Sequence, residues 1–446
     1  MTQNVIRPGT GRGSEVSGLP QFDNPTKLVW RMLWCDQGMA NLVEVHGDSG
    51  EVALILIDFG TELMRKSTIV RKSQAASPVA KIRKALDDND GYLDLLVVSH
   101  QDTDHWSLLD YLYATYDDPS ELTVGKVARG GSDWGKKAKA AVKRYADRTT
   151  DISKDFVPWS GATVTDYEVN TGKKTKIADF GGVVFRVLCV NAPVSGSASM
   201  RKNGTSAVIV AEVKNWTFIF PGDATWETLG EANRILAAWQ KKKKKSAVIP
   251  CLAMGAPHHG AMASLTQRRT RLSVREYLQA TEFVNLTRPT SVGVSAGSQN
   301  AFFHPYKDVL NLLGKHAGVA QKHSTFVYDE KKNSWEVNDN EERAIFTTVL
   351  SGPNTINEIK VADWDFSFDF STNKVTYTAN EFIEPTPAFA VAKSKAGQER
   401  RLERQKKRQK TGNEKTVTTA FAVSLDPIAP PHVKRAIARP ASEIAR

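Results

Sequence analysis

Two histidines and two aspartates lie within six residues of one another in the stretch SHQDTDHW. They are His100, Asp102, Asp104 and His105, and they follow the apolar run LDLLVV, which is typical of a strand buried on both faces. A strand end holds the backbone in place, and the loop after it lets alternate side chains converge on one point. Because imidazole and carboxylate groups are protein ligands of zinc, manganese and iron, this spacing indicates a metal site. The alternative is a polar surface turn in which one aspartate caps the next helix.

Further groups of the same chemical types follow two other apolar runs. Asp223 comes after WTFIFPG, where Gly222 permits a close approach of the backbone. His258 and His259 come after CLAMGAP and precede a glycine, and His304 in NAFFHPYKDVL is a further candidate. Strand ends on one edge of a sandwich bring together residues that are distant in sequence. We therefore expect these side chains to meet the first group.

Apolar runs of strand type alternate with segments of helical spacing along most of the chain. We expect strands at 41–47, 51–60, 93–100, 183–193, 206–213, 216–223, 247–260 and 290–297, and helices at 106–116, 224–240 and 304–316. This alternation predicts an α/β fold, a two-sheet sandwich flanked by helices.

The composition divides the chain into four parts. Residues 1–24 are expected to be a flexible leader rich in Gly, Ser and Thr, and residues 25–355 are expected to form the main folded domain. Residues 356–390 follow as a C-terminal extension, and 391–446 form a basic, charge-dense tail that we expect to be disordered. The lysine block at 240–245 is expected to be a solvated loop, with the lining of a groove as the alternative.

The formal net charge of +11 favours an anionic partner, such as nucleic acid, a nucleotide or an anionic surface. A merely soluble basic protein is the alternative. The three cysteines contain no C-x-x-C pair, which argues against a thiolate metal cluster and against a disulfide framework. No signal-peptide pattern is present, and no stretch approaches the roughly 18 apolar residues that cross a bilayer. We expect a cytoplasmic protein without a membrane partner.

The motifs together resemble the metallo-β-lactamase superfamily, whose signature is H-x-H-x-D-H. The similarity runs over roughly residues 28–352 and is strongest to the branch of the DNA-uptake protein ComEC, which has H-x-D-x-D-H, as residues 100–105 do. Other matching segments follow in the same order: CDQGMANLVEV, ILIDFG, NGTSAVIVAEV, PGDATWETL, PHHGAMAS and SVGVSAGSQNAFFHP. The resemblance implies a four-layer αββα sandwich.

The resemblance also implies hydrolysis by a metal-bound hydroxide at two divalent ions, zinc or manganese. His100, Asp102 and either His258 or His259 would bind one ion. The other ion would take Asp104 and His105, and Asp223 would bridge the two; Asp104 would also orient the water. An aspartate at 102 in place of the usual histidine is a harder donor, which favours manganese beside zinc.

The sequence departs from the superfamily pattern at three points. No histidine occurs between His105 and His258, so one metal position lacks its usual ligand and is weak or is completed by water or a carboxylate. Ala261 replaces the serine of the H-H-G-S loop. The membrane channel of ComEC has no counterpart, so transport is not implied.

Several polar residues near these motifs are candidates for substrate contact. Ser298, Asn300 and His304 would contact a phosphate or protonate the leaving group, and Lys202, Asn203 and Ser206 would line the cleft from the other side. For each of them, a role in stabilising a loop or turn is the alternative. The expected substrate is DNA or RNA, cut by a phosphodiesterase or nuclease. Alternatives are a small signalling nucleotide, then a lactam, lactone or thioester. A metal-binding subunit of weak activity that meets a protein partner through the tail is a further alternative.

Overall fold

The computed structural model describes residues 24–62, 69–70, 77–131, 134–148, 157–158, 176–243, 250–266, 274–298, 302–352 and 359–384. All of them belong to the unit Met1–Lys395. The basic tail and all but the last residue of the leader lie outside the described residues.

The first sheet has eight strands in the order β17-β16-β1-β2-β3-β4-β5-β6. Their bounds are β1 (Pro25–Met32), β2 (Ala40–Gly47), β3 (Val52–Phe59), β4 (Tyr92–Val98), β5 (Thr123–Arg129), β6 (Val157–Pro158), β16 (Ile359–Asp369) and β17 (Lys374–Glu384). Pairing is antiparallel from β17 to β3 and parallel from β3 to β6. The carboxyl ends of β3, β4 and β5 therefore share one edge.

The second sheet has seven strands in the order β15-β12-β11-β10-β9-β8-β7. Their bounds are β7 (Lys176–Phe180), β8 (Val183–Cys189), β9 (Val208–Val213), β10 (Trp216–Phe220), β11 (Cys251–Gly255), β12 (Val292–Val294) and β15 (Ile345–Thr347). Strands β10, β11, β12 and β15 are parallel, so their carboxyl ends also lie together. A separate hairpin consists of β13 (Val319–Asp329) and β14 (Ser334–Arg343).

Aromatic side chains join the inner faces of the two sheets. Trp30 of β1 stacks on Phe366 of β16 with ring centroids 4.3 Å apart. The same ring meets the edge of Phe220, from the second sheet, at 5.2 Å. Gly293 of β12 leaves room for this packing, because a Cβ there would lie 2.7 Å from the Trp30 ring. The sheets thus pack face to face around one core.

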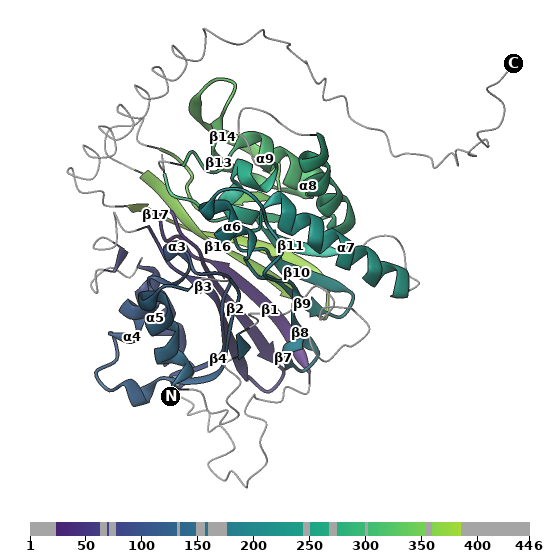
Figure 1. Ribbon diagram of the computed structural model, residues 1–446. Coiled ribbons are helices and arrows are strands. Elements are labelled where there is room, and N and C mark those ends of the chain that lie inside the picture. The colour runs from purple at the N-terminus through teal and green to yellow at the C-terminus, as the bar shows by residue number, and fades with distance from the viewer. Residues whose placement is uncertain are drawn as a thin grey trace, which may run out of the picture. The chain divides into compact units, whose positions relative to one another are not determined.

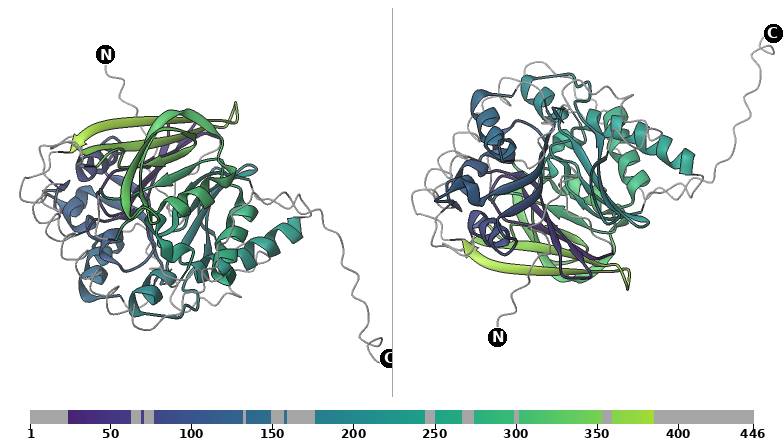
Figure 2. Two further views of the ribbon diagram at one scale, coloured as in Figure 1. Left: turned by 90° about the horizontal axis from the view of Figure 1, so that it is seen from above. Right: turned by 90° about the horizontal axis from the view of Figure 1, so that it is seen from below.

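Helices cover the outer faces of both sheets (Figures 1 and 2). On the first sheet these are α2 (Pro78–Asp87), α3 (Thr103–Trp106), α4 (Leu109–Tyr113) and α5 (Lys136–Ala146). The second sheet carries α6 (Ala198–Gly204), α7 (Trp226–Lys243), α8 (Val274–Thr287) and α9 (Lys307–Leu313). Short 3-10 turns complete the fold: η2 (Pro119–Glu121), η4 (Pro257–Gly260), η5 (Met262–Ser264) and η6 (Gly314–His316). The fold is a four-layer αββα sandwich, which confirms the predicted fold class.

Every strand expected from the sequence has a counterpart, but three segments differ from expectation. The lysine block at 240–245, expected to be a loop, continues α7 as far as Lys243. The predicted helix at 106–116 is broken, because α3 ends at Trp106 and α4 begins at Leu109. Residues 359–384, predicted to lie in an extension beyond the main domain, form β16, which pairs with β1, and β17, which pairs with β16. This segment is therefore part of the first sheet. Among the described residues, none of the helices combines the length and the apolar character needed to cross a membrane.

Candidate metal centre

The ligand types predicted from the sequence meet at the carboxyl ends of the central strands. His100 follows β4, and Asp104 and His105 lie in α3, the short helix after it. Asp223 follows β10 of the other sheet, and His259 lies in the turn η4 after β11. The ends of parallel strands from both sheets therefore meet in one place, as expected for ligand sites in α/β folds.

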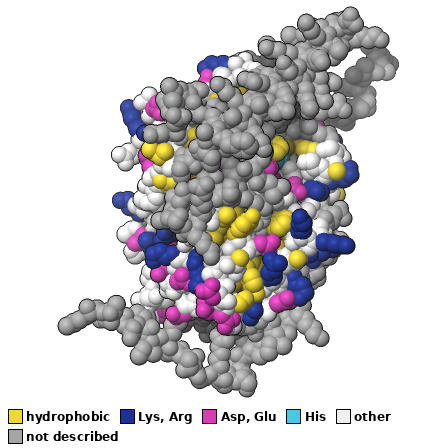
Figure 3. All heavy atoms as spheres, turned by 90° about the vertical axis from the view of Figure 1, so that its left-hand side faces the viewer, with side chains coloured by type: hydrophobic (Ala, Val, Ile, Leu, Met, Phe, Trp, Pro, Cys, Tyr) yellow, Lys and Arg dark blue, Asp and Glu magenta, His cyan; other side chains and the backbone are white. Residues whose placement is uncertain are grey.

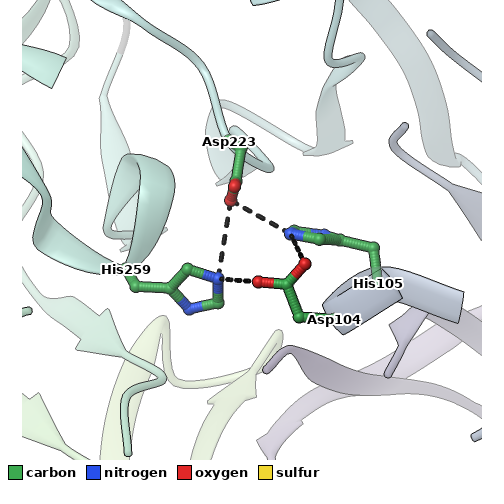
Figure 4. A group of neighbouring side chains, drawn as sticks. All are labelled: Asp104, His105, Asp223 and His259. Atoms are coloured by element: carbon green, nitrogen blue, oxygen red, sulfur yellow. Dashed lines mark ion pairs between the residues drawn. The ribbon is translucent and has the colours of Figure 1, made fainter. Parts of the chain in front are cut away.

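Four of these side chains form a tight group: Asp104, His105, Asp223 and His259 (Figure 4). One ligand atom from each lies within 4.8 Å of all the others. The Oδ1 atom of Asp223 is 3.1 Å from His105 Nε2 and 3.6 Å from His259 Nε2. Asp104 completes the group with Oδ2 at 3.4 Å from His259 Nε2. Two imidazoles and two carboxylates around one point form a ligand set of the zinc or manganese type.

A second set of side chains faces the other oxygen of Asp223. Its Oδ2 atom lies 3.7 Å from His100 Nε2 and 3.5 Å from His258 Nε2. His100 Nε2 is also 3.9 Å from Asp102 Oδ2. Asp223 thus stands between two pairs of histidines, with one oxygen toward each pair.

Buried atoms without hydrogen bonds make this a good site for cations. The Nε2 atoms of His100, His105 and His259 and the Oδ1 atom of Asp223 are buried and have no hydrogen-bond partner. Each such atom costs about 1–3 kcal/mol when it is left unsatisfied. They also point toward one another, so a divalent cation between them would satisfy several at once. The residues present therefore fit a metal.

Hydrogen bonds on the far side of the rings determine which histidine nitrogen faces the centre. Asp58 Oδ2 lies 2.9 Å from His105 Nδ1, and Asp58 Oδ1 accepts a hydrogen bond of 2.6 Å from the Ser99 N–H. His259 Nδ1 lies 2.7 Å from the carbonyl oxygen of Ser295. Protons held on these Nδ1 atoms leave both Nε2 lone pairs for a metal.

Asp58 was not among the site residues predicted from the sequence. It lies at the end of β3, in the ILIDFG segment, and it is fully buried. Its φ of 58° is a left-handed conformation, which aspartate tolerates better than most residues. A lone acidic residue at the end of an apolar strand was the available signal. Its partner, His105, is 47 residues away, and no local pattern identifies it.

The backbone of η4 explains how two consecutive histidines enter one site. His258 has a φ of 49° and His259 a φ of 54°, so both are left-handed. Neighbouring side chains on an extended strand would point in opposite directions. The tight turn is held by the His258 N–H, which donates to the Gly222 carbonyl at 2.9 Å. As a result His259 faces Asp223 Oδ1 and His258 faces Asp223 Oδ2.

The charges in the site shift the pKa values of its groups in opposite directions. Burial lowers the pKa of His100 to about 4, and the charge of His105 adds to this, so His100 is neutral at pH 7. Burial also disfavours charged His105, but the carboxylates of Asp223 and Asp58 raise its pKa well above the usual value, so a metal would displace the proton from Nε2 when it binds. For Asp223, burial is outweighed by His258 and His105, which hold its pKa well below the usual range. The carboxylate of Asp223 is therefore ionised and can bind a cation.

A cavity of about 430 Å³ opens over the metal centre. His304 lines it, with a ring centroid 5.4 Å from that of His258. The Asn203 amide also lines it and lies 2.9 Å from His258 Nε2. Lys202 is exposed beside it, with Nζ 3.8 Å from Asp102 Oδ1. These three predicted substrate residues lie at or beside the cavity.

The other predicted substrate residues have different positions. Ser206 is fully buried, and its Oγ accepts a hydrogen bond of 3.0 Å from the Asp223 N–H. It therefore positions Asp223 and does not line the cleft, which corrects the prediction. Ser298 is buried and is not part of the cavity wall. Asn300 lies outside the described residues.

Comparisons with known proteins give a distant structural likeness. No protein-family model matches the chain, and no curated protein matches it. Among solved structures, the chain is similar to a long form of RNase Z from yeast, at 12% sequence identity and a TM-score of 0.31. The match covers 62% of this chain and 37% of the yeast protein, so the chain spans well under half of that protein. A likeness this distant says nothing about substrate.

The layers, with two sheets inside and helices outside, agree with the αββα sandwich that the motifs imply. Assignment to the ComEC-like branch rests on the sequence motif alone.

Proposed function

We propose that this chain is a metal-dependent phosphodiesterase or nuclease of the ComEC-like type, which holds two divalent cations, zinc or manganese. One observation carries the proposal: the two carboxylate oxygens of Asp223 face two different pairs of histidines. A carboxylate placed in this way suits a bridge between two ions.

The first ion would be held by the tight group of Asp104, His105, His259 and Asp223 Oδ1. The second would be held by His100, Asp102, His258 and Asp223 Oδ2. His258 would supply the ligand that the superfamily takes from a histidine between positions 105 and 258, which this sequence lacks. We infer that the second ion binds more weakly. His258 Nε2 is also in contact with the Asn203 amide, and this contact competes with a metal.

Two bound cations would lower the pKa of water and stabilise the charge that develops on a phosphodiester in the transition state. The side chains of the chain supply positioning and proton transfer. Asp104, beside His259, would orient the attacking water through its carboxylate. His304 lies in the wall of the same cavity and would protonate the leaving oxygen.

A phosphodiester suits the charges around the centre. The cavity floor holds the carboxylates of Asp102, Asp104 and Asp223, which would repel an anion unless cations are bound. The chain as a whole carries a formal charge of +11. A small signalling nucleotide is the second candidate, because a cavity of about 430 Å³ is large enough to enclose one.

The first test is cleavage of end-labelled single- and double-stranded DNA and RNA with Mn²⁺, Zn²⁺ or Mg²⁺. Wild type is compared with Asp104→Ala and with Asp110→Ala. Asp110 lies on α4 and pairs with Arg144 at the surface, so its loss should leave cleavage intact. Asp104→Ala should lower the rate by a factor on the order of 100 or more. Absence of cleavage by wild-type protein that contains bound metal would refute the nuclease and direct the search to small nucleotides.

A further inference from the structure

Five basic side chains lie on two helices that begin or end beside the metal centre. Lys136, Lys137 and Lys139 are in the first half of α5, and Arg201 and Lys202 are in α6. All five are exposed. We propose that this basic rim binds the phosphates of a polynucleotide that flank the scissile bond. The inference rests on the proposed function and narrows its substrate to a polymer.

The loop between β5 and α5 places the rim next to the site. Gly131, in this loop, packs so tightly that a Cβ on it would lie 3.1 Å from His100 Cα. Its N–H donates to the carbonyl of Thr205 at 3.2 Å, and Thr205 directly follows α6. Lys136 comes five residues after Gly131. The start of α5 and the end of α6 therefore lie on the same side of the metal centre.

The lysines at the start of α5 differ from the basic residues at its end. Lys143 pairs with Asp147 at 2.5 Å, and Arg144 pairs with Asp110. In contrast, no ion pair joins Lys136, Lys137 or Lys139 to a carboxylate in the part of the chain that the structure describes.

Among the described residues, the charge of the first half of α5 is therefore not neutralised by an ion pair. Figure 3 shows the left-hand side of Figure 1, where Lys and Arg side chains are interspersed with Asp and Glu over the face as a whole. Three neighbouring cations that have no acidic partner among the described residues form a surface that attracts an anion with several charges.

The position of these lysines is also unfavourable for the helix itself. The amino end of a helix carries a partial positive charge and prefers acidic residues. The first turn of α5 contains no acidic residue and begins with Lys136 and Lys137. A local preference that is broken beside a candidate active site is typical of a functional surface.

The charges of the site and of the rim are opposite, and this determines how a substrate would lie. The cavity contains Asp102, Asp104 and Asp223, while the rim next to it is cationic. Lys202 marks the boundary, since its Nζ is 3.8 Å from Asp102 Oδ1. One phosphate would bind over the cations and its neighbours along the chain would contact the rim. A mononucleotide has no further phosphodiester linkages to reach α5, so the rim favours a polynucleotide.

The experiment measures, by fluorescence anisotropy, how tightly the full-length protein binds a labelled oligothymidylate of about 20 nucleotides. The buffer contains EDTA, and the salt concentration is varied. The test variant is Lys136→Ala/Lys137→Ala. Lys27→Ala/Lys374→Ala is the control, because it removes the same charge from two exposed lysines on β1 and β17. Those two positions both pair with Asp369, at the end of the sheet far from the site. Alanine is the best helix former, so α5 should stay folded.

Loss of two phosphate contacts should reduce the slope of log affinity against log salt by about 1.4 and weaken binding roughly tenfold or more near 0.1 M salt. The control should bind like wild type. An unchanged slope in the test variant, or an equal loss in the control, would overturn the proposal. Hydrolysis of bis(p-nitrophenyl) phosphate with Mn²⁺ is measured in parallel. Failure of wild type in that assay would count against the proposed function, whereas binding in EDTA does not depend on catalysis.

Discussion

Replacement of Asp58 by asparagine should weaken metal binding although Asp58 faces away from the cations. In the wild type, Asp58 Oδ2 lies 2.9 Å from His105 Nδ1 and keeps a proton on that atom. An asparagine nitrogen at the same place would donate to Nδ1 instead. The His105 proton would then move to Nε2, the atom that faces Asp223 Oδ1 at 3.1 Å. A protonated Nε2 cannot bind a metal.

The size of the effect follows from the contacts that change and those that remain. The asparagine Oδ1 can still accept the Ser99 N–H, which Asp58 binds at 2.6 Å. Asparagine also tolerates the left-handed backbone at this position, where φ is 58°. The fold should therefore survive. Loss of a residue that orients a metal-binding histidine typically lowers metal affinity 10- to 100-fold, or about 1.4–2.7 kcal/mol.

The assay is titration calorimetry of metal-free protein with Mn²⁺ and Zn²⁺, together with thermal unfolding in EDTA. The matched control is Asp94→Asn. Asp94 is also fully buried and accepts a backbone hydrogen bond, 2.7 Å long, from Leu54 on the neighbouring strand. It lies six residues before His100 on β4, roughly 20 Å away along the strand. The control should lose stability without a specific loss of metal affinity.

Two results would refute this account of Asp58. One is an affinity of Asp58→Asn within a factor of about two of wild type, which would mean that Asp58 does not determine the His105 tautomer. The other is an equal loss of affinity in Asp94→Asn, which would assign the effect to general destabilisation.

Three further predictions concern stability and metal content. Burial raises the pKa of Asp363 despite its ion pair with Lys81, and its carboxylate also accepts the Trp34 N–H at 2.8 Å. Asp363→Asn should lower the melting temperature at pH 7, because the amide NH2 would face one of these two donors; an equal or higher melting temperature would contradict this. Gly222 has a φ of 52°, and a Cβ on it would lie 2.3 Å from Ser206 Oγ. Gly222→Ala should therefore lower the free energy of unfolding in urea by about 1–3 kcal/mol and weaken metal binding. A divalent metal at 100 times its Kd should raise the free energy of unfolding of the wild type by about 2.7 kcal/mol, and a chelator should reverse the gain. In Asp223→Ala the metal should cause almost no shift in melting temperature.

Much of the fold could be predicted from the sequence because its signals are local. The apolar run that became β4 is buried on both faces, since helices cover one side and the second sheet covers the other. The segments that were missed have weaker local patterns. Strand β16 is recognised by its pairing with β1, more than 300 residues earlier in the chain, and only that pairing makes it part of the first sheet.

The sequence by itself determined which ligand types the protein carries and that they follow strand ends. Spacing within SHQDTDHW and the dipeptide His258–His259 is a local property of the chain, and it is visible without a fold. Only the tertiary structure decided which oxygen of Asp223 each histidine faces and that Asp58 holds His105. These are contacts between the ends of strands from two sheets. They depend on sheet order and on left-handed turns at single residues, and no short stretch of sequence contains that information.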